Sequence, residues 1–114
     1  MIGLPSSLLF ACSENSVRSP MAEALAKRLY GHRVYIDSVG VRASEVDGFA
    51  VAALDEIDID VHRHHAKTFD DVDAASFELI VTLSPEAHHS ALEFTRRTAT
   101  EVEYWPTPDP TVAT

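Results

Sequence analysis

The sequence predicts an α/β domain of three layers, in which a four-stranded parallel sheet lies between helices. Short apolar runs typical of strands alternate along the chain with longer helical stretches, the order expected of parallel strands joined by crossover helices. In addition, a Ser-Pro pair follows two of the apolar runs, at residues 19–20 and 84–85. Serine at the N-cap with proline at the first helical position is a typical helix start.

The first strand is expected over Leu8–Ala11, a short apolar run that predicts a buried strand. The first helix is expected to begin at Ser19-Pro20 and to end near Gly31. Its expected apolar face consists of residues spaced four apart: Met21, Leu25 and Leu29.

The second strand is expected over Val34–Ile36, with Asp37–Gly40 as its exit turn and residues 42–47 as a polar loop. A second helix is expected to end near Asp58, because apolar residues recur at helical spacing before it. These apolar residues are Phe49, Ala52, Ala53 and Ile57.

The segment from His62 to Asp73 is polar and is expected to be irregular, and Phe77–Thr82 is the third expected strand. The next helix is expected from Ser84-Pro85 to Arg96-Arg97, since it carries an acid early and bases late. Val102–Trp105 is the last expected strand, and the proline-rich residues 106–110 predict a stiff loop.

Composition limits the function classes. A chain of 114 residues is long enough for one domain with a modest core. No apolar run approaches the roughly 20 residues of a membrane span, and the first residues lack the pattern of a signal peptide. The net charge of −9 argues against nucleic acids and anionic membranes as partners. The chain has one cysteine, so it forms no internal disulfide, and we expect a cytoplasmic protein.

The stretch Cys12–Ser19, which reads C-S-E-N-S-V-R-S, joins the first strand to the first helix. Backbone N–H groups and the positive end of a helix dipole converge at such a junction and make an anion-binding loop. A thiol there is stabilised as the nucleophilic thiolate, and Arg18 adds a fork that can bind two phosphate oxygens. The alternative is a buried structural cysteine followed by a solvated arginine.

These residues resemble the low-molecular-weight protein tyrosine phosphatases. The signature of that family is Cys, five residues, Arg and Ser near the N-terminus, with Asn three places after the Cys. In this chain the signature falls on Cys12, Asn15, Arg18 and Ser19, followed by the family-like Pro20-Met21-Ala22-Glu23-Ala24. The Asp-Pro pair of the family corresponds to Asp109-Pro110. We therefore expect residues 1–114 to form one domain of this kind, with strand order 2-1-3-4.

The resemblance implies that Cys12 attacks phosphorus while Arg18 and the loop N–H groups bind the equatorial oxygens. It also implies that Asp109 acts first as general acid and then as general base. Cys12 and Asp109 both follow strands, whose carboxyl ends meet at one edge of a parallel sheet. The alternative is that Asp109 only shapes the proline-rich turn.

The resemblance further implies a supporting hydrogen-bond network formed by Asn15, Ser19, Ser38 and His62. Asn15 suits a tight loop because asparagine tolerates left-handed backbone, whereas Ser38 taken alone is equally typical of a solvated turn. The remaining residues of the expected phosphate loop are Ser13, Glu14, Ser16 and Val17.

Several positions depart from the family pattern. Glu14 stands where the family usually has glycine, and it either points to solvent or weakens phosphate binding. Val17 replaces a frequent second cysteine, and Thr111-Val112 stand where eukaryotic members carry a Tyr pair. The family's final helix is missing from the sequence. Either the sequence is truncated, or something else, such as a second copy of the chain in a homodimer, covers the apolar face.

The expected function is hydrolysis of phosphate monoesters by a cysteine-dependent protein tyrosine phosphatase. Expected ligands are a phosphorylated protein or small aryl phosphate, and the anions phosphate, sulfate and arsenate. One alternative is a thiol-dependent arsenate reductase, because that family shares the fold and loop and Asn15-Ser16 resembles its sequence. Its usual disulfide relay needs further cysteines, and Thr82 and His88-His89 stand where these are expected. The other alternative is a non-catalytic oxyanion- or phosphopeptide-binding regulatory module.

We expect neither a cofactor nor a metal. The histidines lack a second cysteine or an H-E-x-x-H motif beside them, and Asp70-Asp71-Val72-Asp73 lacks the Gly and Glu of a calcium loop. The histidines considered are His62, His64, His65, His88 and His89.

Overall fold

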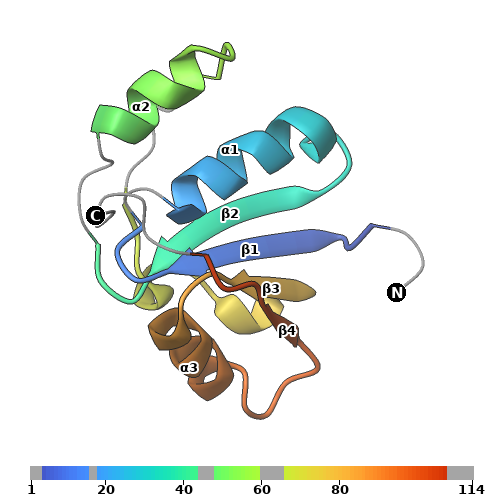
Figure 1. Ribbon diagram of the computed structural model, residues 1–114. Coiled ribbons are helices and arrows are strands. Elements are labelled where there is room, and N and C mark those ends of the chain that lie inside the picture. Colours follow the sequence, from blue (N-terminus) through green and yellow to red (C-terminus); the bar gives the residue numbers. More distant parts are fainter. Residues whose placement is uncertain (1–3, 16–17, 44–47, 60–65, 108–114) are drawn as a thin grey trace.

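Four parallel strands form one sheet in the order β2-β1-β3-β4, which confirms the predicted sheet and strand order. The computed structural model describes residues 4–15, 18–43, 48–59 and 66–107 (Figure 1). The strands are β1 (Ser7–Cys12), β2 (Tyr35–Gly40), β3 (Leu79–Thr82) and β4 (Glu101–Tyr104). Cys12 pairs with Gly40, and Ala11 pairs with Thr82. The carboxyl ends of β1, β2 and β3 therefore lie together at one edge of the sheet.

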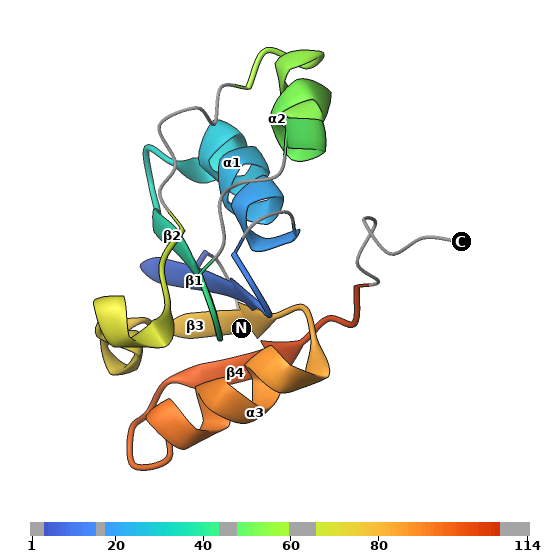
Figure 2. The ribbon, with the colours of Figure 1, turned by 90° about the vertical axis from the view of Figure 1, so that its left-hand side faces the viewer.

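Helices cover both faces of the sheet, as predicted for a three-layer domain (Figures 1 and 2). On one face α1 (Arg18–Tyr30) packs on β1 and β2, and α2 (Gly48–Asp55) packs against α1 on the side away from the sheet. The opposite face carries α3 (Pro85–Phe94) and two 3₁₀ turns at Phe69–Asp71 and Ala74–Ser76.

The central strand β1 is buried on both of its faces. Leu9 and Ala11 belong to the core cluster under α3, whereas Phe10 and Cys12 belong to the cluster under α1. This two-sided burial explains why β1 reads as a continuous apolar run rather than an alternating pattern. Cys12 is therefore both the last residue of β1 and part of the core beneath α1.

The apolar face predicted for the first helix is wrong for two of its three residues, because only Met21 packs against a core cluster, that of Leu54 and Ile59. Leu25 and Leu29 are 40% and 64% exposed, while Ala22 and Ala26 pack against the core cluster that contains Cys12. The leucine spacing indicates an amphipathic helix but does not show which side approaches the sheet. Small alanine side chains let the helix axis lie close to the strands, so the sheet-facing side is the less hydrophobic one.

Two boundaries near the Cys12 loop also differ from the prediction. The described part of α1 already includes Arg18, so Ser19 lies within the helix and is not its N-cap. The strand β2 continues to Gly40, because Asp37–Gly40 pairs with β1 where an exit turn was predicted. Both differences bring polar residues of neighbouring elements against the loop.

The segment that precedes β3 is more regular than predicted. Thr68 caps the turn Phe69–Asp71 through a capping box with Asp71, and Phe69 and Ala74 are buried in the core under α3. β3 begins at Leu79 rather than Phe77, whose ring is buried outside the strand.

The second Ser-Pro pair behaves as predicted. Ser84 is the N-cap of α3, and its Oγ accepts a hydrogen bond from the backbone N–H of Ala87 at 3.1 Å. The helix ends at Phe94, before the predicted Arg96-Arg97. α2 likewise matches the predicted second helix but ends at Asp55.

The described chain continues to Thr107, and the residues 105–107 that follow β4 are not helical. No helix in the described ranges is long and apolar enough to cross a membrane.

Candidate active site

Cys12 lies at the base of the loop that leads from β1 to α1. Its side chain is buried, and two groups approach Sγ. The backbone N–H of Asn15 donates to Sγ at 3.2 Å, and the Oγ of Ser19 lies 2.9 Å from it. Hydrogen bonds from such groups favour an anionic partner over a neutral one. This geometry suits a sulfur that reacts as the thiolate.

The loop backbone turns sharply at Asn15, whose φ is 54°. This left-handed conformation is the one that the sequence predicted asparagine to tolerate. Gly40 lies directly against the turn, and a Cβ at that position would lie 2.4 Å from the carbonyl oxygen of Arg42 and 2.7 Å from the Asn15 nitrogen. Only glycine lets the end of β2 approach the loop this closely.

The first residues of the loop are bonded to the exit of β2 and to the start of α3. Val41 N–H donates to the carbonyl of Cys12 at 3.1 Å, and Arg42 N–H donates to that of Ser13 at 2.8 Å. The hydroxyl of Ser13 donates to Ser84 Oγ at 3.1 Å. Two elements remote in sequence therefore hold the loop on either side.

The side chain of Asn15 is fully buried and bonds to residues of three segments. Its Oδ1 accepts from Lys67 N–H at 2.9 Å, and its Nδ2 donates to Ser19 Oγ at 2.7 Å and to Ser38 Oγ at 2.9 Å. The structure thus brings together three of the four residues expected in the supporting network. Ser38 lies in β2 and is fully buried, so it is not a solvated turn serine.

A further residue of this cluster was not singled out from the sequence. Glu23 lies on the sheet-facing side of α1, where it is buried and accepts from Ser38 Oγ at 2.5 Å and from Lys27 Nζ at 2.5 Å. The available signal was its position four residues after Ser19 and four before Lys27. That spacing places it one helical turn from a site residue and in register for an ion pair.

Arg18 is the first residue of α1, and its Nη1 donates to the carbonyl of Thr107 at 2.8 Å. Thr107 belongs to the proline-rich segment that follows β4, so the guanidinium connects the Cys12 loop with that segment. An arginine carries five N–H donors, and the remaining ones are of the right kind for anion oxygens.

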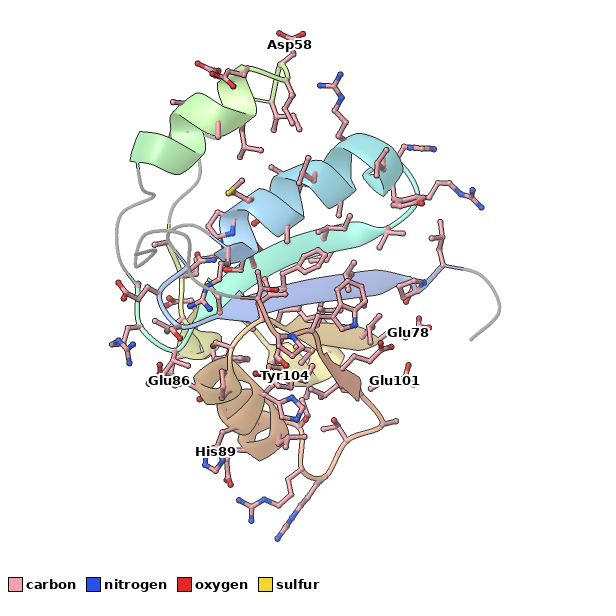
Figure 3. The ribbon with its side chains drawn as sticks, viewed as in Figure 1. Asp58, Glu78, Glu86, His89, Glu101 and Tyr104 are labelled. Carbon is pink, nitrogen blue, oxygen red and sulfur yellow. The ribbon has the colours of Figure 1, made fainter. Side chains whose placement is uncertain are left out.

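The rim of the loop carries both signs of charge. Glu14 is exposed, which agrees with the first of its two predicted orientations. Arg42 makes a two-point contact with Glu86, the labelled glutamate at the start of α3 in Figure 3, at 2.7 and 3.1 Å. The hydrogen bond and charge of Glu86, with a smaller contribution from Glu14, raise the pKa of Arg42. The same hydrogen bond lowers the pKa of Glu86.

Four of the predicted site residues lie outside the described part of the chain. These are Ser16, Val17, His62 and Asp109. Within the described part, no group of three His, Cys, Asp or Glu side chains is placed to hold a metal. His88 instead bonds Thr82 Oγ1 through Nδ1 at 2.9 Å and packs on the Tyr104 ring, while His89 is exposed (Figure 3).

A family model described as low molecular weight phosphotyrosine protein phosphatase matches residues 7–110. The chain belongs to this family. The match covers all four strands and extends past Asp109, so it confirms the resemblance inferred from the Cys12 loop. The phosphatase-family fold is also found in the solved tyrosine phosphatase Wzb from Escherichia coli K30, in complex with sulphate. That likeness has a TM-score of 0.82 at 21% identity, over 97% of this chain and 84% of that one.

Proteins named arsenate reductases are also similar to this member of the phosphatase family. Arsenate reductase 1 of Staphylococcus haemolyticus is 35% identical over 81 residues, which is 71% of this chain and 61% of that protein. A solved arsenate reductase in the phosphate binding state has a TM-score of 0.77 at 25% identity, over 93% of this chain and 79% of that one. The matched part of this chain thus spans 61–64% of the length of curated relatives such as these arsenate reductases.

Proposed function

We propose that this chain is a cysteine-dependent phosphate monoester hydrolase acting on phosphotyrosine, and that residues 1–114 form its catalytic domain. The observation that carries the proposal is the position of Cys12 Sγ, buried at the base of a loop that opens onto the start of α1. Two donors, Asn15 N–H and Ser19 Oγ, lie within hydrogen-bond distance of the sulfur. A thiolate placed there is nucleophilic, and the positive end of the helix dipole attracts the phosphate group that the thiolate attacks.

In the proposed reaction the Cys12 thiolate attacks phosphorus in line with the ester oxygen. The S–P bond forms as the P–O bond breaks, and the carboxyl group of Asp109 protonates the leaving oxygen. The resulting carboxylate then takes a proton from water, whose oxygen attacks the phosphocysteine. The S–P bond breaks, phosphate leaves, and the thiolate is restored.

The contact between Arg18 and Thr107 supports the assignment of Asp109. Asp109 follows Thr107 by two residues, and the Thr107 carbonyl is bonded to the arginine that would bind the phosphoryl oxygens. The proposal therefore assigns the general acid to Asp109, because the chain two residues before it is bonded to Arg18. The overall charge of −9 repels phosphate at long range, so binding depends on the local loop N–H groups and Arg18.

The test is hydrolysis of p-nitrophenyl phosphate between pH 5 and 8 by the full chain and by two variants. We expect turnover by the wild type, no turnover by Cys12→Ser, and a loss of about 100-fold or more in Asp109→Ala, as for a missing general acid. Hydrolysis of phosphotyrosine peptides in preference to phosphoserine peptides would support the substrate class. Wild-type binding of phosphate without a burst or turnover would exclude the enzyme.

A second function is supported by the similarity to proteins named arsenate reductases. Since Cys12 is the only cysteine, the two electrons would come from an added thiol. Cys12 would form an S–As bond with arsenate and release water. The external thiolate would then attack the Cys12 sulfur, and arsenite would leave with the electron pair of the S–As bond. A second thiol would reduce the mixed disulfide and restore Cys12.

Arsenate-dependent oxidation of added glutathione or glutaredoxin, lost in Cys12→Ser, tests the reductase. The result expected for the phosphatase is turnover of the aryl phosphate with no arsenate-dependent thiol oxidation. If neither reaction occurs and phosphate binding saturates, the chain is a non-catalytic oxyanion-binding module.

A further inference from the structure

A continuous series of hydrogen bonds connects the surface of α1 with the Cys12 loop. The buried carboxylate of Glu23 accepts from Lys27 through Oε2 and from Ser38 through Oε1, at 2.5 Å each. Lys27 is half exposed, whereas Ser38 is fully buried. The Oγ of Ser38 in turn accepts from Asn15 Nδ2 at 2.9 Å. Burying a carboxylate is costly unless it is paired, and the contacts with Lys27 and Ser38 pair the carboxylate of Glu23.

The directions of these bonds follow from the groups that can only donate or only accept. Lys67 N–H is a backbone donor, so the side-chain atom of Asn15 that it bonds must be the oxygen Oδ1. The amide nitrogen Nδ2 then faces the two serines and gives one hydrogen to Ser19 and the other to Ser38. Both hydroxyl oxygens are therefore acceptors in these bonds.

Ser38 has a single hydroxyl hydrogen, and it cannot be directed at the Asn15 amide. Ser38 donates this hydrogen to Glu23 Oε1, which as a carboxylate oxygen can only accept. Glu23 therefore fixes Ser38 as an acceptor toward Asn15. With an uncharged group in its place, the Ser38 hydroxyl could reverse and compete with the amide.

The same reasoning applies to Ser19, whose hydrogen has two available acceptors. One is the carbonyl of Val39 at 3.3 Å and the other is Cys12 Sγ at 2.9 Å. Because Ser19 already accepts from Asn15, its hydrogen is free for the sulfur whenever Cys12 is a thiolate. The donor to the thiolate thus depends on the orientation of Asn15. Lys67 N–H holds that amide at Oδ1, and Ser38, kept as an acceptor by Glu23, holds it at Nδ2.

We propose that Glu23 is a positioning residue for Cys12, acting through Ser38, Asn15 and Ser19 to keep a hydroxyl donor directed at the thiolate. The inference rests on the proposed function, in which Cys12 reacts as the thiolate. Glu23 does not contact the sulfur, so its removal should change the reactivity of Cys12 without removing any group that binds the anion.

The test is the pH dependence of Cys12 alkylation by iodoacetamide, which reports the thiolate directly because the chain has one cysteine. In Glu23→Gln the amide cannot accept from both Ser38 and Lys27, so one of the two ordered contacts is lost. We expect the midpoint of the alkylation profile to rise by about one pH unit, and alkylation near pH 6.5 to slow about tenfold.

Two further variants separate positioning from a structural role. Ser38→Ala should raise the midpoint by a similar amount, and the double variant should raise it no further, since both changes interrupt one series of bonds. Glu93→Gln is the matched control, because it also removes a helical glutamate from an ion pair, with Arg96 on the surface of α3. Its midpoint should equal that of the wild type.

An unchanged midpoint in folded Glu23→Gln, or shifts that add in the double variant, would overturn the proposal. If Glu23→Gln does not fold, the Ser38→Ala profile decides in the same way. A wild-type chain whose Cys12 is not alkylated below pH 7, and not protected by phosphate, would instead contradict the proposed function itself. Failure of the inference and failure of the proposed function therefore give different results.

Discussion

The two Ser-Pro pairs of this chain have the same local sequence but different structural roles. Ser84 caps α3 and accepts from the Ala87 N–H, whereas Ser19 lies inside the first turn of α1 and is bonded to Asn15 and Cys12. Both hydroxyls are buried, and both lie at the edge of the sheet where β1 and β3 end. One stabilises a helix, and the other lies next to the candidate nucleophile.

The difference teaches that a capping motif does not determine which residue caps. Arg18 and Ser19 already belong to α1, so the serine that the motif places at the N-cap lies within the helix, where its hydroxyl faces the loop. The loop reaches this position because Asn15 adopts a left-handed conformation and Gly40 leaves room beside it. Long-range packing, rather than local propensity, therefore assigns the role of the first serine.

The largest effect is expected from Gly40→Ala, which fills the space beside Asn15 that the loop before α1 needs and that the start of α3 does not. The new Cβ would lie under 3 Å from backbone atoms of Arg42, Asn15 and Glu14, at 2.4, 2.7 and 2.7 Å. Backbone at this distance cannot move aside without displacing the loop. We expect a loss of phosphate binding together with a fall of about 3 kcal/mol or more in unfolding free energy. Urea unfolding and phosphate titration measure the two effects, and near-wild-type values in both would contradict the account of Gly40.

Ser19→Ala should come next, with an effect mainly on Cys12. It removes the hydroxyl 2.9 Å from Sγ and leaves one hydrogen of the buried Asn15 amide without its acceptor. We expect iodoacetamide alkylation of Cys12 at pH 6.5 to slow about tenfold or more, and stability to fall by about 1–3 kcal/mol. Alkylation as fast as in the wild type would show that the Ser19 hydroxyl is not needed to support the thiolate.

Ser84→Ala is the counterpart at the other helix start and should mainly affect stability. Loss of an N-cap serine costs about 1 kcal/mol, because the Ala87 N–H loses its partner. The alkylation rate of Cys12 should change much less than in Ser19→Ala, since Ser84 is bonded to Ser13 and not to Cys12 or Asn15 among the described loop residues. Thermal unfolding and the alkylation rate of Cys12 are measured for both variants. Equal losses of stability and equal changes in alkylation rate would contradict the different roles of Ser19 and Ser84.

The elements and their order were predictable from the sequence because burial on both faces makes strands such as β1 and β3 short apolar runs. Cys12, Asn15, Arg18 and Ser19 were predictable as a group because they lie within one short loop. Local spacing alone carries that information, and the structure places all four at the carboxyl edge of the sheet.

The rest of the cluster depends on contacts between remote segments, which a single sequence does not display. Ser38 meets Asn15 only because β2 pairs beside β1, and Lys67 contributes a backbone N–H that no side-chain pattern reveals. Glu23 was missed for a related reason. The leucine spacing indicated a different buried face of α1, so it did not predict that Glu23 lies against the sheet.

The smallest effect is expected from Glu86→Gln, which weakens the contact between the start of α3 and the β2 exit beside the Cys12 loop. The Arg42 hydrogen bond lowers the pKa of Glu86 in the folded chain below its unfolded value. The contribution of Glu86 to stability is therefore present above the unfolded carboxyl pKa of about 4.3 and is lost as the pH falls through the lower, folded value. Both side chains are well exposed, so solvent screening limits this contribution to about 0.5 kcal/mol.

Urea unfolding of wild type and Glu86→Gln at pH 7 and at pH 3 measures this contribution. The difference between the two proteins should be small at pH 7, shrink toward zero at pH 3, and decrease when salt is added at pH 7. A difference that grows on acidification would mean that Glu86 is bound more tightly in its protonated form, and that Arg42 is not its dominant partner.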